Sequence, residues 1–567
     1  MARRGRSLIE SATEPGTPHS GAIESRNSGG HAIPTRIATT VRNAVPLLFL
    51  GIFFLWPVAA LVRRAVAVNS AGDSVFTLLA RTHALHLLAV TLGQAGASTL
   101  VALIVAAPIV WLYARLPGTG SVVLTVIVTV PFVLPSVVVG VAFRALLNGP
   151  LAGLGMGSGW PAVLAAHAFL NVAVVVRVVG AAWRSQDTRA EEAARALGAT
   201  RTRAWFSVVL PRLVPAIGGA AALVFLFCST SFGVIIILGG GTLRTLETEI
   251  YTQAIGYFRI PEAVMLSLLQ IVVVVAVLLC TRIFAGPAGA PGTAGAGRTP
   301  AAVTGPTWIP VAAAWAWSLL VLLGPIVVLA LRSVRPSAGG AWTFAGYRAL
   351  AEPVNGVTPL ATLRYSLTSA VLAMVIALAV GVLAAIALHR SHGVAGALGN
   401  LIAMVPLGIS AVTLGFGYLI VLAALPAEVA ASPVVIPCVQ ALIAVPVVIR
   451  IVLPALESVP GRLREAAAVL GAGPLRVFCT VDMPLIGRSV GAAGGFAFVM
   501  ALGEFGATSF LARADTTTLP VLIGSALNRP GATELATAMA ASTLLVIITS
   551  LAVLAVEVVR PRSGTLI

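Results

Sequence analysis

Twelve long apolar runs alternate with short polar segments along this chain. A helix that crosses a membrane needs about 20 mostly apolar residues, and each run meets that length. Six runs lie in the N-terminal half, near 44–64, 88–114, 120–146, 160–183, 213–238 and 261–284. Six lie in the C-terminal half, near 308–332, 363–389, 395–424, 431–456, 485–511 and 534–558. The pattern predicts an all-α polytopic membrane protein with about twelve transmembrane helices.

The runs fall into two groups of six, which predicts one six-helix unit over 42–284 and a second over 307–560. Between them, residues 285–306 are rich in Gly, Pro and Ala, a composition typical of a flexible linker. Residues 1–41 are polar and contain no cleavable signal, so we expect a disordered cytoplasmic tail. A second cytoplasmic tail is expected over 561–567.

A polar segment with one pattern occurs in both halves, between the fourth and fifth apolar runs, at 184–212 and at 457–484. The shared residues are Glu192, Ala193, Ala194, Gly198 and Pro211 in the first copy, and Glu465, Ala466, Ala467, Gly471 and Pro484 in the second. Each residue of the second copy lies 273 positions after its counterpart. This constant offset indicates a tandem duplication.

Composition supports a membrane protein. Hydrophobic residues make up 58% of the chain and charged residues 10%, whereas a soluble domain carries about 25% charged residues. The net charge is +17, but the arginines lie at the ends of apolar runs, as in positive-inside flanks. We therefore expect membrane lipid around the protein and no nucleic-acid partner.

The predicted topology places both termini on one side of the membrane, because the number of spans is even. Arginines near both ends of the chain indicate that this side is the cytoplasm. We expect a multi-pass protein of the inner membrane with both termini cytoplasmic. The two repeated segments then lie in the cytoplasm as well.

Sequence motifs for catalysis are missing. The chain contains no lysine, so it cannot form a P-loop of the GxxxxGK[ST] type. Its four cysteines form no CxxC pair, which argues against a metal site or a disulfide framework. We expect no catalytic site, no cofactor and no bound metal.

The repeated segment has two interpretations. It is either an ordinary capped amphipathic loop copied by the duplication, or a short helix pair that inserts into a groove on a partner. Thr188 and Glu191 form a capping-box pattern at its start. The glycine in each copy marks a break between two short helices. The close match between the copies favours the second interpretation.

The Glu-Ala-Ala, Gly and Pro spacing resembles the EAA loop of binding-protein-dependent ABC importer permeases. The fused layout, with the segments at 230–233, 245–251 and 503–506, is similar to the ferric-iron and thiamine permeases. The resemblance implies two tandem permease units of the type I ABC importer fold. It also implies that the EAA loops act as coupling helices on two copies of a cytoplasmic ATPase, which hydrolyses the ATP. An extracytoplasmic or lipid-anchored substrate-binding protein would deliver the cargo.

The expected translocation pathway includes Ser231, Phe232, Glu504 and Phe505. Glu504 lies in the eleventh apolar run, and Ser231 is its counterpart in the repeat. Acids within spans are rare and often functional. Glu504 therefore either makes a structural hydrogen bond to a hydroxyl or backbone group, or favours a cationic cargo such as Fe(III) or thiamine.

Two further features concern the pathway. Pro131, Pro135 and Pro406 lie inside predicted spans, as tolerated kinks or as bends that line the pathway. Glu247 and Glu249 are expected on an external loop, in contact with a cargo-delivering protein.

Two functions of other classes compete with the importer interpretation. A secondary transporter driven by an ion gradient would require membrane-embedded acids paired across the repeat, and Glu504 is matched by Ser231. A structural or signalling membrane protein would leave the repeated segment without a purpose. Within the importer interpretation, ferric iron is the first expected cargo and thiamine the second, followed by phosphonate or polyamine.

Overall fold

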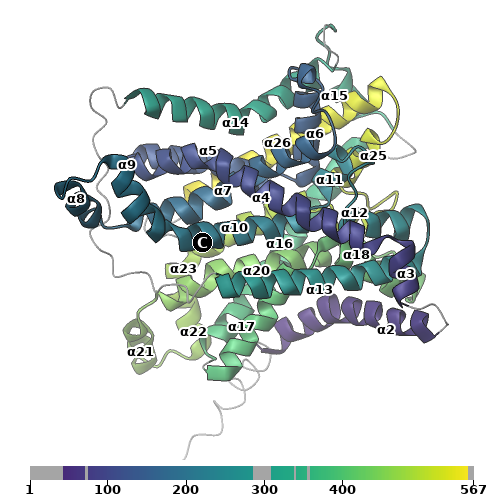
Figure 1. The fold of residues 1–567 in the computed structure, drawn as a ribbon. Coiled ribbons are helices and arrows are strands. Elements are labelled where there is room, and N and C mark those ends of the chain that lie inside the picture. The colour runs from purple at the N-terminus through teal and green to yellow at the C-terminus, as the bar shows by residue number, and fades with distance from the viewer. Residues whose placement is uncertain are drawn as a thin grey trace, which may run out of the picture.

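The computed structural model describes residues 43–70, 75–284, 308–336, 340–353, 358–391 and 393–559. The tails and the linker predicted from the sequence lie outside these residues. Within them the chain forms helices and no strand, and the long helices run side by side across the molecule (Figure 1). The prediction of an all-α polytopic protein is confirmed.

The described part of the first half contains seven long helices and five short ones. Its long helices are α2 (Trp56–Ser70), α4 (Ala84–Arg115), α5 (Gly118–Val133), α6 (Ser136–Leu147), α7 (Trp160–Ser185), α10 (Leu210–Ser229) and α13 (Ile260–Phe284). Its short helices are α3 (Val75–Arg81), α8 (Arg189–Ala196), α9 (Arg201–Ala204), α11 (Gly233–Leu238) and α12 (Leu246–Tyr251).

The second half repeats this order. Its long helices are α14 (Trp308–Val334), α16 (Pro359–His389), α17 (Gly393–Gly408), α18 (Ala411–Ala423), α20 (Val435–Glu457), α23 (Met483–Gly503) and α26 (Ala532–Val559). Its short helices are α15 (Ala345–Ala349), α19 (Ala427–Ala430), α21 (Gly461–Val469), α22 (Pro474–Val477), α24 (Thr508–Leu511) and α25 (Leu519–Leu527).

The twelve spans predicted from the sequence equal the largest number of spans that the structure allows. Ten helices in the described part of the chain are long and apolar enough to cross a membrane, and there are up to twelve spans if each bent helix pair counts as one. The bent pairs are α5 with α6, at 99°, and α17 with α18, at 85°. The third and ninth runs, predicted as single spans, are therefore broken.

Proline explains both bends. Pro131 lies in the last turn of α5 and Pro135 directly precedes α6, while Pro406 lies in the last turn of α17. A proline has no amide hydrogen to donate and its ring clashes with the preceding turn, so it kinks or ends a helix. The bends confirm a kink at these prolines, whereas their role in lining a pathway stays a prediction.

The fifth and eleventh spans also end earlier than predicted. Helix α10 ends at Ser229 and α23 ends at Gly503, and the short helices α11 and α24 follow each break. At the first break the hydroxyls of Ser229 and Thr230 donate to the carbonyl of Leu226, at 2.9 and 3.0 Å. Such side-chain bonds compete with the helical pattern and favour its termination.

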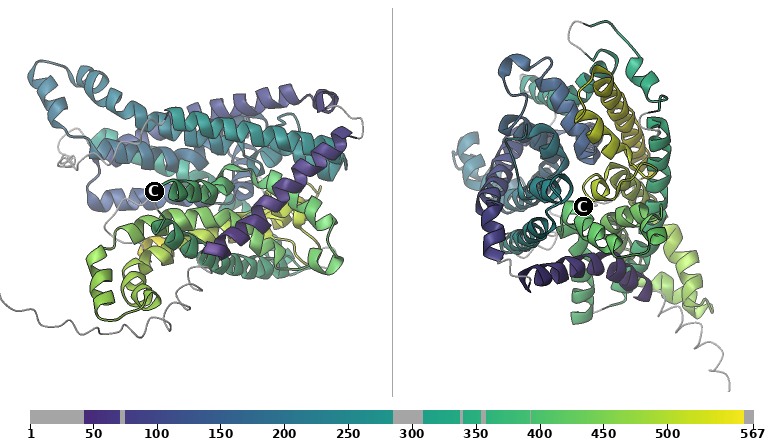
Figure 2. Two further views of the ribbon diagram at one scale, coloured as in Figure 1. Left: turned by 90° about the horizontal axis from the view of Figure 1, so that it is seen from below. Right: turned by 90° about the vertical axis from the view of Figure 1, so that its right-hand side faces the viewer.

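The first span of each half packs against the other half. Helix α2 contacts α18, and α14 contacts α6, α4 and α26. The main apolar core accordingly includes buried residues of both halves, among them Phe169 and Phe416. The two views in Figure 2 show the helices of the two halves gathered into a single bundle. The duplicated units therefore share one interior.

Two glycines at matched positions of the repeat, Gly233 and Gly506, allow the chain after α10 and after α23 to pack closely against the start of α6 and of α18. A Cβ added to Gly233 would lie 2.3 Å from the Ser136 hydroxyl oxygen, and one added to Gly506 would lie 2.9 Å from the Ala411 Cβ. Each glycine therefore allows the start of α11 or α24 to contact the start of α6 or α18. A larger residue would separate these elements.

We expect Gly506→Ala to lower the stability of the folded protein, because overpacking a tight contact costs about 1–3 kcal/mol. The measurement is the apparent melting temperature in detergent. Gly487→Ala in α23 is the matched control, since a Cβ there meets no atom within 4 Å. Equal melting temperatures for the two variants would contradict the proposed close approach.

Candidate functional site

Two helical projections lie at the same end of the molecule. One is formed by α8 and α9 after α7, and the other by α21 and α22 after α20 (Figure 1). Figure 2 shows both at one end of the bundle in its left view. These are the two segments whose sequence pattern repeats.

A left-handed glycine ends the first helix of each projection. Gly198 has φ of 89° and Gly471 has φ of 81°, values that residues with a Cβ rarely adopt. The amide of Ala199 donates to the carbonyl of Ala194, and the amide of Ala472 donates to that of Ala467, each at 3.0 Å. This is the Schellman pattern, which reverses the chain after a helix. The break predicted at these glycines is present in both copies.

The tips of both projections present small and apolar side chains to solvent. Glu192, Ala193, Glu465 and Ala466 are exposed, whereas Ala194 and Ala467 are half-buried. Leu197 is 90% exposed and Leu470 is 88% exposed. Large apolar side chains at such exposure are typical of a surface that a partner covers.

A π-helical turn joins each projection to the long helix that follows. The turns are at Trp205–Val209 and Phe478–Asp482, and Pro211 and Pro484 then lie in the first turn of α10 and α23. A proline cannot donate the usual helical hydrogen bond, and the wider turn before it accommodates that loss. Each projection thus continues into its long helix without a break.

The second projection is held by an ion pair that sequence reasoning missed. Arg464 donates to the carboxylate of Asp482 at 2.7 Å and to the carbonyl of Leu456 at 2.8 Å. The matched residues of the first copy are Glu191 and Val209, so this pair cannot form there. The sequence signal was a basic and an acidic residue 18 positions apart in one copy only.

The structure brings together the two phenylalanines of the predicted pathway. Phe232 and Phe505 stack with their ring centroids 5.2 Å apart and their planes inclined by 19°. Because they occupy matched positions of the repeat, the contact lies between the two halves. Each residue falls in the break after α10 or α23.

Ser231 and Glu504 make separate contacts. Ser231 bonds Nε2 of His167 at 2.8 Å, and Nδ1 of His167 bonds the hydroxyl of Ser98 at 2.9 Å. The carboxylate of Glu504 accepts the amides of Ala507 and Thr508, at 2.7 and 2.9 Å, so it caps the start of α24.

Sequence reasoning did not select His167 or Ser98. The signal for them was a polar side chain inside an otherwise apolar run. The pathway role of Glu504 stays a prediction, because its backbone contacts do not test cargo binding.

The expectation that Glu247 and Glu249 lie on an external loop is wrong. Both are buried on α12, which begins with a capping box formed by Thr245 and Thr248. The amide of Leu246 donates to the hydroxyl of Thr91 at 3.0 Å, which anchors α12 to α4. These local polar contacts make a buried helix out of a segment that appears loop-like in sequence.

Glu247 connects the two halves. Its carboxylate accepts the side-chain amide of Gln270 at 2.7 Å and the hydroxyl of Ser410, which is the N-cap residue of α18 in the second half. The carboxyl is fully buried, and burial raises the pKa of Glu247 to about 8. Buried carboxylates favour the neutral form in this way.

Acidic side chains dominate the buried charges. Among the residues that the structure describes, the buried aspartates and glutamates are Glu247, Glu249, Asp482 and Glu504, and no arginine is buried. The arginines whose burial the structure describes lie at partly or fully exposed positions. Asp482 belongs to the ion pair of the second projection, so Glu247, Glu249 and Glu504 are the acids buried within the bundle.

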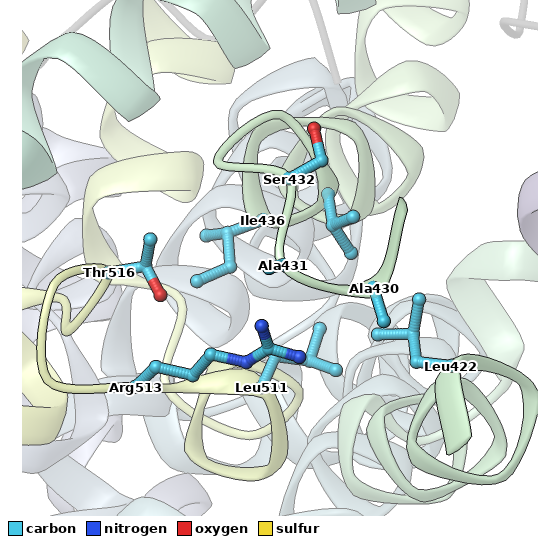
Figure 3. Close-up of a pocket in the computed structure, with 9 residues that line it drawn as sticks. Leu422, Ala430, Ala431, Ser432, Ile436, Leu511, Arg513 and Thr516 are labelled. Carbon is cyan, nitrogen blue, oxygen red and sulfur yellow. The ribbon is translucent and has the colours of Figure 1, made fainter. Parts of the chain in front are cut away.

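A small pocket lies at the end of the molecule opposite the two projections. It is lined by residues of the turns around α19 and after α24, including Ala430, Ser432, Leu511, Arg513 and Thr516. Figure 3 shows the guanidinium of Arg513 extending across the pocket between the two turns. None of the site residues predicted from the sequence lines it.

Comparison with known proteins gives a consistent result. The family model described as binding-protein-dependent transport system inner membrane component matches residues 98–286. The chain is 27% identical over 498 residues to the thiamine transport system permease protein of Brucella abortus (strain 2308). That alignment covers 84% of this chain and 88% of the relative.

Shorter relatives align with part of the chain. The molybdenum transport system permease protein of Mycobacterium tuberculosis is 31% identical over 255 residues, which cover 43% of this chain and 89% of the relative. The sulfate transport system permease protein of Escherichia coli is 27% identical over 231 residues, covering 39% and 82%. Each shorter relative thus matches less than half of this chain, as a duplication requires.

We expect Glu247 to make the stability of the protein depend on pH. Its folded pKa of about 8 lies above the ordinary value of 4.5, so the unfolded chain loses the proton first as pH rises. Stability should therefore fall between about pH 4.5 and 8, by roughly 1.4 kcal/mol per pH unit at most. Glu247→Gln should reduce this dependence, as measured by melting temperature in detergent from pH 5.5 to 8.

The control for that measurement is Glu428→Gln on α19, which makes the same change of charge at an exposed position. It should leave the pH dependence of the wild-type protein in place. A Glu247→Gln variant that melts with the wild-type pH dependence would show that this carboxyl is not the group responsible.

Proposed function

Because the chain belongs to the family of binding-protein-dependent transport system inner membrane components, we propose that its two halves together form the pathway of an ATP-driven thiamine importer. The chain is a fused permease with two units. We assign these units to residues 42–284 and 307–560, and we place both termini in the cytoplasm. The translocation pathway then runs between the halves.

The acidic interior is the observation that carries the choice of cargo. A buried carboxyl group presents acceptor oxygens and can lose its proton when a cation approaches, so it favours a cation over an oxyanion, and thiamine is an organic cation. The relative that aligns across both halves is a thiamine permease, whereas the relatives named for molybdenum and sulfate transport align with part of the chain.

Ferric iron is the second candidate cargo. The described residues include no group of three or more His, Cys, Asp or Glu side chains that could hold a metal ion. Thiamine therefore comes first.

The two projections are the proposed contacts with the ATPase. Glu192, Glu465 and the neighbouring alanines lie on exposed short helices that end in left-handed glycines. Small side chains allow a close approach, and the exposed Leu197 and Leu470 supply apolar surface for a groove. We assign one projection to each of two ATPase copies and assign ATP hydrolysis to those subunits. A binding protein, soluble or lipid-anchored, delivers cargo at the opposite end.

The long helices that follow the projections suit the transmission of motion. Residues Arg201–Ser229 form one continuous helix of 29 residues, and Pro474–Gly503 form one of 30. At 1.5 Å per residue each is about 45 Å long. A rigid helix of this length connects an ATPase contact at one end with the Phe232 and Phe505 stack at the other. Closure of the ATPases would therefore move the two rings. We propose that this movement opens the pathway alternately to the two sides of the membrane.

An ion-gradient-driven transporter is the competing mechanism. Such a protein would carry acids in matched positions of both halves, because both halves would handle the coupling ion. Here Glu247 is matched by Pro520 and Glu504 by Ser231. No buried acid in the described residues has an acidic counterpart, which favours the importer.

Purification from native membranes in mild detergent tests the importer directly. We expect the tagged chain to bring down a nucleotide-binding ATPase, with a binding protein whose ligand is thiamine. An intact chain that repeatedly purifies without any ATPase would favour the ion-driven mechanism instead. An ATPase together with a binding protein for another ligand would keep the importer and overturn the thiamine assignment.

The coupling role makes a separate prediction. We expect Glu192→Ala combined with Glu465→Ala to reduce thiamine uptake at least tenfold in proteoliposomes, because both ATPase contacts lose their acidic side chain. The melting temperature should change little, since both residues are exposed. Glu428→Ala, at the opposite end of α20, is the matched control and should transport normally. Normal uptake by the double variant would refute the coupling role.

A further inference from the structure

We propose that the stacked rings of Phe232 and Phe505 form a contact site for cargo, selective for a flat and positively charged aromatic ring. The inference rests on the proposed importer function and adds the chemistry by which the pathway recognises its cargo. It concerns the permease itself and not the binding protein that delivers the cargo. A metal ion or a saturated cation would gain less from such a site.

The position of the two rings supports a place on the pathway. Residues at matched positions of a duplicated protein meet at the axis that relates the halves, and in transporters built from repeats the cargo site lies at that interface. Both rings also fall in interruptions of long helices. Non-helical backbone at membrane depth is tolerated only where protein buries it or where it lines a cavity.

Two further aromatic rings, those of Tyr251 and Phe510, continue the cluster around the Phe232 and Phe505 stack. Tyr251 of α12 lies 5.3 Å from Phe232, and Phe510 of α24 lies 5.3 Å from Tyr251, both measured between ring centroids. Phe232 and Phe505 are 5% and 8% exposed, so the stack is closed in this conformation. When the two halves separate, each ring would offer its face to a molecule passing between them.

The carboxyl groups near the rings favour a cation over an anion. Glu504 directly precedes Phe505, and Tyr251 lies on the same short helix as Glu247 and Glu249. The face of an aromatic ring attracts a cation, and the attraction grows when water is excluded. A ring that is both flat and positively charged can stack on phenylalanine and also benefit from the acids. An oxyanion would meet negative ring faces and carboxyl groups.

The simpler alternative is that the rings only pack the interface. Leucine would then serve nearly as well as phenylalanine, because it provides apolar volume without a π face. The two explanations therefore differ in what leucine and tryptophan do at the same position, and in whether cargo touches the rings at all.

Photocrosslinking tests the contact. The permease, assembled with its ATPase and binding protein in proteoliposomes, would carry p-azidophenylalanine in place of Phe232, of Phe505 or of Phe169. Phe169 is the control, because it pairs with Phe143 inside the first half. During turnover with radiolabelled thiamine, we expect label on the chains altered at 232 and 505, at least tenfold above the chain altered at 169. Thiamine transport without label at 232 or 505 would overturn the site and leave the importer function standing.

A second measurement does not depend on the photoreactive residue. We expect Phe505→Leu to lower thiamine uptake about tenfold and Phe505→Trp to retain most of it, with both variants folded and assembled with the ATPase. Phe169→Leu should match the wild-type protein. Equal uptake by the Leu and Trp variants would show that the rings only pack. A wild-type complex that imports no thiamine would overturn the cargo assignment and this site together.

Discussion

Every backbone amide and carbonyl at membrane depth has to find its hydrogen-bond partner within the protein, and this constraint decides where the helices can stop. Three of the four central interruptions are closed by a local polar side chain, and the fourth has Pro135 before α6. Thr230 donates to a carbonyl in the last turn of α10, Glu504 accepts two amides at the start of α24, and Ser410 accepts two amides at the start of α18. Polar residues within the apolar runs therefore satisfy the backbone groups that a helix break exposes at three of these four places.

The two halves share some of these side-chain hydrogen bonds and differ in others. The first amide of α12, on Leu246, donates to Thr91, and the first amide of α25, on Leu519, donates to Ser366. The contact between the halves differs, because Ser410 caps α18 and binds Glu247, whereas Pro135 stands before α6. One side of the shared interior is thus held by a buried hydrogen bond and the other by apolar packing. The halves have the same architecture but do not need to move equally.

The sequence predicted the features that depend on local pattern. Run length located the spans, and the glycines at 198 and 471 marked the breaks in the projections. It did not locate the ends of α10 and α23, because apolar residues continue past each break and the length of an apolar run does not register the local side-chain hydrogen bonds at these ends. It also misplaced Glu247, since a polar segment of this kind appears solvent-exposed until its partners on α13 and α18 are known.

The predicted pathway residues were grouped only by their positions in the repeat. That Phe232 and Phe505 touch depends on how the two halves dock, which no pattern within one half can determine. By contrast, the Schellman geometry of the projections follows from residues within one turn of each glycine. Local devices could be inferred from the sequence, whereas contacts between the halves could not.

The distribution of charge gives the clearest link between the fold and its cargo. The net charge of the chain is +17, yet the buried charges in the described residues are acidic. Arginine stays charged wherever it lies, so it is placed where water can hydrate it, at the surface, where it orients the helices in the membrane. A buried carboxyl can instead become neutral, as the raised pKa of Glu247 shows. Under the proposed function, an interior of this kind tolerates its own acids in the absence of cargo and would stabilise a cation that passes through, which an arginine-lined interior would not do.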